Sequence, residues 1–83
     1  MDYNYKISGV CSRGVSFSIE DGIVKNVEFL GGCDGNTKGV AKLCEGRDAK
    51  ELINILSGIK CGFKNSSCPD QLAKAIEDAI NNQ

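Results

Sequence analysis

The first third of the chain alternates between apolar and polar residues, which is the period of a β-strand. In two segments every second residue is apolar: Tyr3, Tyr5 and Ile7, and then Val15, Phe17 and Ile19. Such alternation indicates strands with one buried and one exposed face. A third apolar segment follows at residues 23–30 and ends at the glycine-rich stretch 31–36. The pattern therefore predicts three consecutive strands.

A turn at Asp21-Gly22 separates the second and third predicted strands. A two-residue loop would pair Glu20 with Ile23 and put the apolar residues of the two strands on opposite faces. A three-residue loop over residues 20–22, with Gly22 left-handed, instead places Ile19 beside Ile23. We therefore predict the three-residue loop, because it gives the hairpin one apolar face.

After residue 30 the apolar period changes from two to about 3.6, the period of an α-helix. Asn36 can cap a first helix that ends at Gly46, and Asp48 starts a second helix that ends at Gly58. Pro69 suits the first turn of a last helix, in which Ser67 or Cys68 takes the cap position. The apolar stripe of that helix consists of Leu72, Ala73, Ile76, Ala79 and Ile80. Strands followed by helices predict an α+β fold, in which a three-stranded antiparallel sheet carries about three helices packed on one face.

Length and composition narrow the class of protein. The 83 residues, 1–83, are expected to form a single domain. Ten basic and eleven acidic residues give a net charge of -1, which argues against sequence-independent nucleic-acid binding. No apolar run approaches the roughly 18 residues of a membrane span, and the first residues lack the pattern of a signal peptide. We therefore expect a cytoplasmic protein, whose thiols stay reduced unless they bind metal or carry out redox chemistry.

The chain has five cysteines and no histidine. The absence of histidine excludes Cys-His and Ser-His catalytic pairs and the zinc sites that use imidazole. Cys44 falls on the apolar stripe of the first predicted helix, where we expect it to pack as a small hydrophobic residue. The other four stand at the ends of predicted elements, where a fold can bring them together: Cys11, Cys33, Cys61 and Cys68. No Cys-x-x-Cys pair is present, so spacing alone indicates neither a zinc knuckle nor a thioredoxin-like motif.

Cys68 stands at the start of the last predicted helix, where unpaired N–H groups and the helix dipole favour a thiolate. Such a thiolate serves as a metal ligand or as a nucleophile, with Cys61 or Cys33 as the resolving thiol. An alternative function is that of a binding module, which docks a protein partner or binds an anion or nucleotide in the glycine-rich loop, through Gly32, Gly35 and Asn36. This loop is no P-loop, because the Gly-Lys-Ser/Thr sequence of that motif is missing.

Residues 66–70 read Ser-Ser-Cys-Pro-Asp, and the chain resembles the TSCPD domain family, which is named for this motif. The resemblance covers nearly the whole chain, including the segments around Cys11, Cys33 and Cys61, and is closest to short stand-alone members. Longer relatives form a C-terminal module of adenosylcobalamin-dependent ribonucleotide reductases. The resemblance thus implies an accessory association with a ribonucleotide (ribonucleoside-diphosphate) reductase. We do not expect an enzyme in its own right, since 83 residues cannot hold the radical, substrate and allosteric sites together.

A more distant resemblance is to the NifU-like iron–sulfur cluster scaffolds and their fold. It implies that the three ligand cysteines of the scaffolds fall on Cys11, Cys33 and Cys68. Two scaffold residues differ here, since an acid is replaced by Arg13 and a histidine by Ser67. Cys61 adds a fourth sulfur, and four thiolates suit tetrahedral zinc or an iron–sulfur cluster. We therefore expect either a stable all-thiolate site formed by these four cysteines or no site at all, rather than a platform for cluster transfer.

Overall fold

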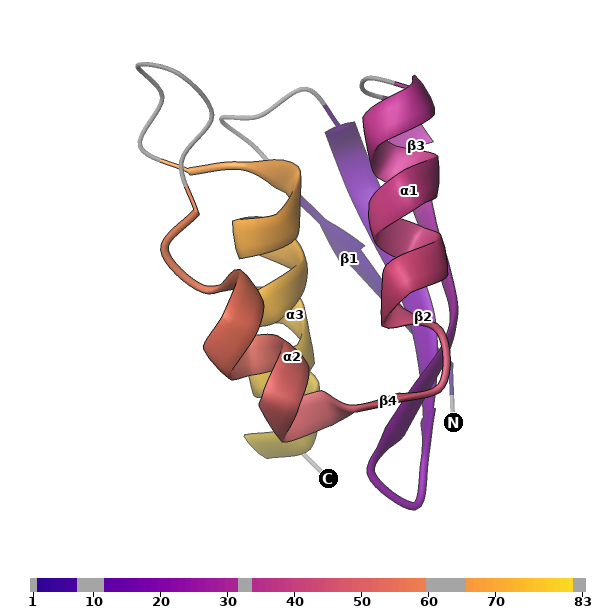
Figure 1. Ribbon diagram of the computed structural model, residues 1–83, viewed down its shortest axis with the longest axis vertical. Helices are drawn as coiled ribbons and strands as arrows, with labels where there is room; N and C mark the ends of the chain where they lie inside the picture. Colours follow the sequence, from indigo (N-terminus) through magenta and orange to yellow (C-terminus); the bar gives the residue numbers. More distant parts are fainter. Residues whose placement is uncertain (1, 8–11, 32–33, 60–65, 82–83) are drawn as a thin grey trace.

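The computed structural model describes residues 2–7, 12–31, 34–59 and 66–81 (Figure 1). These residues form an α+β fold, as the pattern predicts. The elements in chain order are β1 (Asp2–Lys6), β2 (Ser12–Glu20), β3 (Ile23–Gly31), α1 (Asp34–Cys44), β4 (Arg47–Asp48), α2 (Ala49–Leu56) and α3 (Cys68–Asn81). Within the described residues, no helix has the length and apolar character needed to cross a membrane.

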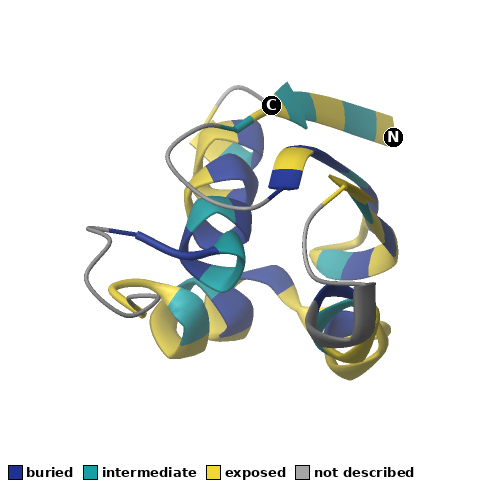
Figure 2. Ribbon diagram, turned by 90° about the horizontal axis from the view of Figure 1, so that it is seen from above, coloured by how far each residue is buried: buried dark blue, intermediate teal, exposed yellow. Residues whose placement is uncertain are grey.

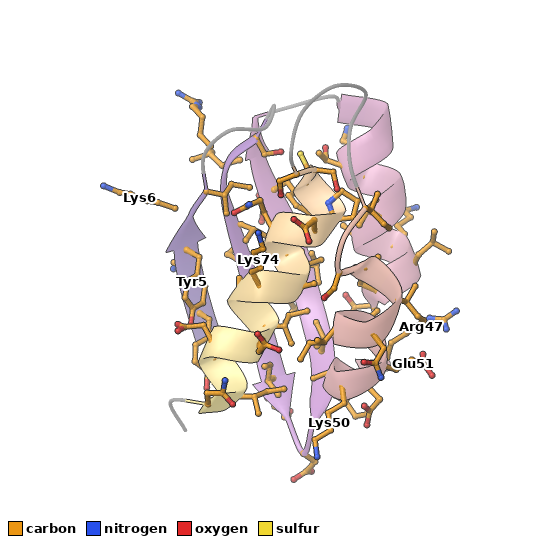
Figure 3. The ribbon with its side chains drawn as sticks, turned by 90° about the vertical axis from the view of Figure 1, so that its left-hand side faces the viewer. Tyr5, Lys6, Arg47, Lys50, Glu51 and Lys74 are labelled. Carbon is orange, nitrogen blue, oxygen red and sulfur yellow. The ribbon has the colours of Figure 1, made fainter. Side chains whose placement is uncertain are left out.

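The strands form one antiparallel sheet in the order β1-β2-β3-β4, and the helices lie over one of its faces (Figure 3). The prediction of three strands misses β4. This strand pairs Arg47 with Val24 and Asp48 with Ile23, and it carries the chain from α1 into α2. Two residues are too short a segment to show an alternating pattern, so the apolar period could not reveal it.

The turn between β2 and β3 differs from the predicted one. Glu20 pairs with Ile23, so the loop has two residues, Asp21 and Gly22, and not three. Both have positive φ angles, +52° and +78°, which is typical of the type I′ turn that fits the twist of a hairpin. The predicted pairing of Ile19 with Ile23 is therefore wrong, and Ile19 pairs with Val24.

A β-bulge explains how this hairpin keeps one apolar face. The pairing shifts between Ser16 and Ser18 of β2, opposite Asn26, which has a φ of +57°. The extra residue in β3 reverses the alternation beyond it. Val24 and Val27 are consequently both buried on the helix side, whereas an uninterrupted ladder would have separated them.

Alanine substitutions at two glycines, Gly22 in the turn and Gly39 in α1, should change stability in opposite directions. Gly22→Ala is expected to lower the free energy of unfolding by about 1 kcal/mol, because the Cβ atom of alanine disfavours the positive φ angle of this turn. Gly39→Ala is expected to raise it by about 0.5–1 kcal/mol, because Gly39 lies within α1 and open space surrounds the position of an added Cβ atom. Urea unfolding followed by circular dichroism measures both changes. A loss of stability at both positions would contradict the helical assignment of Gly39.

The core lies between the sheet and the helices, where the buried faces of the elements meet (Figure 2). Phe17 is 2% exposed and stacks on Tyr3 and Tyr5 of the edge strand, with ring centroids 5.6 and 5.9 Å away. Burial, together with a hydrogen bond to Asp78 of α3, raises the pKa of Tyr5 to about 12. Cys44 is 1% exposed, which confirms its predicted role as a packed residue, and burial raises the pKa of its thiol.

Candidate functional site

One end of the sheet gathers the start of β2, the end of β3 and the start of α3, at the top of Figure 1. Cys68 is the first residue of α3, and its thiol is partly exposed. The antiparallel pairing of β2 and β3 puts Ser12 beside Gly31. Cys68 of α3 contacts Ser12, although the two residues are far apart in the sequence. This end of the molecule is the candidate functional site.

Ser12 connects Cys68 to the sheet. Its Oγ atom lies 3.0 Å from the Sγ atom of Cys68 and 3.4 Å from the carbonyl oxygen of Gly31. Ser12 is 1% exposed, so it is fully buried. The alternation of β2 does not indicate a buried residue at this position, because the strand pairing is irregular between Ser12 and Gly14. Sequence reasoning therefore missed Ser12.

Ser67 caps α3 and holds the chain that leaves α2. Its Oγ atom accepts the backbone N–H of Asp70 at 3.2 Å, which satisfies a donor in the first turn of the helix. The same hydroxyl donates to the carbonyl oxygen of Ile59 at 2.7 Å. Ser67 thus binds the backbone three residues after the end of α2, at Ile59.

Asp70 makes a second contact between α3 and the residues that follow α2. Its buried carboxylate accepts the backbone N–H of Gly58 at 2.7 Å and the hydroxyl of Ser66, and Lys74 lies 3.4 Å from it. The Gln71 amide also donates to the Ser66 hydroxyl, at 2.9 Å. The Ser66 hydroxyl, the Gly58 N–H and Lys74 hold the pKa of Asp70 below its usual value, although burial acts in the opposite direction. The carboxylate therefore joins three parts of the chain.

The Ser-Ser-Cys-Pro-Asp motif thus has a structural meaning. Ser66, Ser67 and Asp70 fasten the two ends of the α2–α3 connection, and Cys68 faces Ser12 of the sheet. The sequence leaves the cap open between Ser67 and Cys68, and the structure shows that Ser67 is the cap. The sequence does not indicate that Asp70 binds Gly58, because that contact depends on where α2 ends.

The structure places few of the predicted site residues. Cys11, Cys33, Cys61 and Gly32 lie outside the described residues. In the described part of the chain, no three cysteine, aspartate or glutamate side chains form a group suited to a metal ion. Gly35 and Asn36 belong to the first turn of α1, which begins at Asp34. Asn36 therefore lies inside the helix, and its predicted role as the cap is wrong. Helix ends are the least certain part of a prediction from sequence.

The described neighbours of the three remaining cysteines nevertheless belong to one chain of hydrogen bonds around the start of α3. Ser12 directly follows Cys11, Gly31 stands two residues before Cys33, and Ile59 stands two residues before Cys61. Ser12 contacts both Gly31 and Cys68. Ile59 contacts Ser67, the residue before Cys68. Of the three chain segments that lead to cysteines, one thus contacts Cys68 directly, and the other two contact Ser12 and Ser67 beside it.

The comparison with protein families identifies the class of the protein. The TSCPD domain model matches residues 3–80, which is nearly the whole chain. The chain belongs to the TSCPD domain family. No curated protein and no solved structure matches the chain significantly. The similarity to the NifU-like scaffold fold therefore stays a prediction.

Proposed function

We propose that the domain binds a zinc ion or an iron–sulfur cluster through Cys11, Cys33, Cys61 and Cys68. The observation that supports this proposal is the chain of hydrogen bonds at Cys68: Ser12 contacts Cys68 and Gly31, and Ile59 contacts Ser67. Consecutive Cα atoms are about 3.8 Å apart. The Cα atom of a cysteine one or two positions along the chain is therefore at most about 8 Å from the Cα atom of the contacting residue.

The donor set and the size of the domain both favour this chemistry. Thiolates are preferred ligands of zinc and of iron–sulfur clusters, and four of them complete a tetrahedral site. A domain of 83 residues buries a modest fraction of its surface, so a metal that links distant segments adds useful stability. Cys44 is 1% exposed in the core and lies outside the proposed ligand set.

Metal analysis of protein purified without oxygen tests the proposal. We expect about one zinc ion per chain, or a cluster with a visible absorption band, and a strong loss of metal in Cys68→Ser. Cys44→Ala is the matched control, because it removes a thiol outside the proposed site, and it should retain the metal. A metal content below about 0.2 per chain after reconstitution, unchanged in Cys68→Ser, would rule out the site.

A second candidate function is thiol–disulfide exchange by Cys68. The partial exposure of Cys68 at the first position of α3 favours it, because a disulfide substrate can reach a residue there. The Cys68 thiolate would attack a substrate disulfide, and Cys61 or Cys33 would resolve the mixed disulfide. The substrate would leave as two thiols and the pair in this protein would be oxidised. One cysteine that is alkylated much faster than the others in metal-free protein would support this function, whereas equally slow thiols would contradict it.

We propose an accessory role in ribonucleotide reduction as the setting of the site. The support is the family resemblance to the C-terminal module of adenosylcobalamin-dependent reductases. Binding of this domain to a reductase that lacks such a module, measured by sedimentation, tests the role. Saturable binding that Cys68→Ser weakens is the expected result, and no binding at micromolar concentrations would contradict it.

The nucleotide-binding alternative at Gly32, Gly35 and Asn36 stays a prediction. A ligand that binds only the folded state raises the unfolding temperature. Thermal unfolding with millimolar nucleoside diphosphates therefore tests this alternative. The absence of any shift would count against a nucleotide site.

A further inference from the structure

Ser12 is the least exposed of the buried polar residues in the described part of the chain, at 1%. It stands on β2, and its hydroxyl faces two groups on other elements, the Cys68 thiol and the Gly31 carbonyl. The sulfur is the nearer of the two, at 3.0 Å against 3.4 Å. Because hydroxyl hydrogen bonds to oxygen are usually about 2.7–2.8 Å long, the contact with Gly31 is a weak one.

The Ser12 hydroxyl has a single proton, so it can donate a hydrogen bond either to the Cys68 sulfur or to the Gly31 carbonyl, but not fully to both. A neutral Cys68 thiol can donate to Ser12, whose own proton then points to Gly31. A thiolate, free or bound to a metal, has no proton and only accepts. In that state the short contact remains favourable only when Ser12 turns its proton to the sulfur.

We infer that Ser12 is a positioning residue for the Cys68 thiolate and donates an O–H···S hydrogen bond to it in the metal-bound state. This inference rests on the proposed thiolate site. Hydrogen bonds to a ligand atom fix its orientation and reduce the charge that it donates to the metal. Ser12 is fully covered, so water cannot replace the hydroxyl once it is removed.

Cobalt(II) titration of anaerobic, reduced protein tests the inference, because cobalt in a thiolate site shows a sulfur-to-metal charge-transfer band. Ser12→Ala is expected to weaken cobalt and zinc binding by about 10- to 100-fold and to shift this band. Ser16→Ala is the matched control. Ser16 is on the same strand but pairs with Asn4 and Glu28 and is not among the contacts of Cys68. It should keep the affinity and the spectrum of the unchanged protein.

Ser12→Thr separates a lost hydrogen bond from a structural defect. Threonine keeps the hydroxyl and is favoured in strands, so it should restore the affinity and the position of the band. Circular dichroism of the metal-free variants confirms that each is folded. The inference is overturned when Ser12→Ala matches Ser16→Ala in affinity and spectrum. Failure of the unchanged protein to bind either metal would instead overturn the proposed function, and this inference with it.

Discussion

Leu72→Ala is expected to lower the free energy of unfolding by about 2–5 kcal/mol. Leu72 is 0% exposed on α3 and packs in the core between this helix and the sheet. Truncation removes buried methyl groups and leaves a cavity that the surrounding side chains fill only in part. A domain of 83 residues has a total stability of about 4–12 kcal/mol, so this single change consumes a large share of it.

Leu43→Ala provides the control with the same chemical change. Leu43 is 69% exposed on α1, and its truncation should alter the free energy of unfolding by less than about 0.5 kcal/mol. The chain has no tryptophan, so urea unfolding is best followed by circular dichroism. Equal effects of the two substitutions would show that α3 does not pack through Leu72.

The apolar pattern predicts the core well because burial is a property of periodic segments. Phe17 and Leu72 stand on clear period-two and period-3.6 stripes, and both are buried. Cys44 follows the same rule, and its predicted role is confirmed. Where the period is interrupted, the prediction fails. The bulge at Asn26, where φ is positive, places one extra residue in β3, and no local sequence pattern predicts it.

The candidate site is harder to predict because its contacts join segments far apart in the sequence. Cys68 at the helix start and a cap at Ser67 or Cys68 are predictable, since both depend on the local start of a helix. Ser12 reaches Cys68 only through the packing of α3 against the start of β2. The contact of Asp70 with Gly58 likewise depends on the place where α2 ends. The motif indicates which residues matter, and the tertiary structure decides which groups they bind.

Asp70→Asn is expected to lower the free energy of unfolding of the metal-free protein by about 1.5–3 kcal/mol at neutral pH, the range for hydrogen bonds to a buried charged group. The carboxylate holds the Gly58 N–H and the Ser66 hydroxyl, and it faces the Lys74 ammonium, which Figure 3 labels on the same helix. The asparagine amide is neutral and carries donors of its own, so it cannot accept from all three groups. Glu77→Gln is the control, because Glu77 is an exposed acid on α3, and it should change stability by less than about 0.5 kcal/mol.

The pH dependence of this effect distinguishes a bound carboxylate from simple packing. The pKa of Asp70 is lower in the folded protein than its ordinary value of 3.8, so the folded state favours the ionised form. The resulting stability is present above that ordinary value and is lost as the pH falls through the folded pKa. Unfolding in urea from about pH 7 to pH 2 should therefore show the difference between the unchanged protein and Asp70→Asn shrinking below about pH 4. A difference that is constant over the whole range would mean that the ionised carboxylate does not fasten α3 to the end of α2.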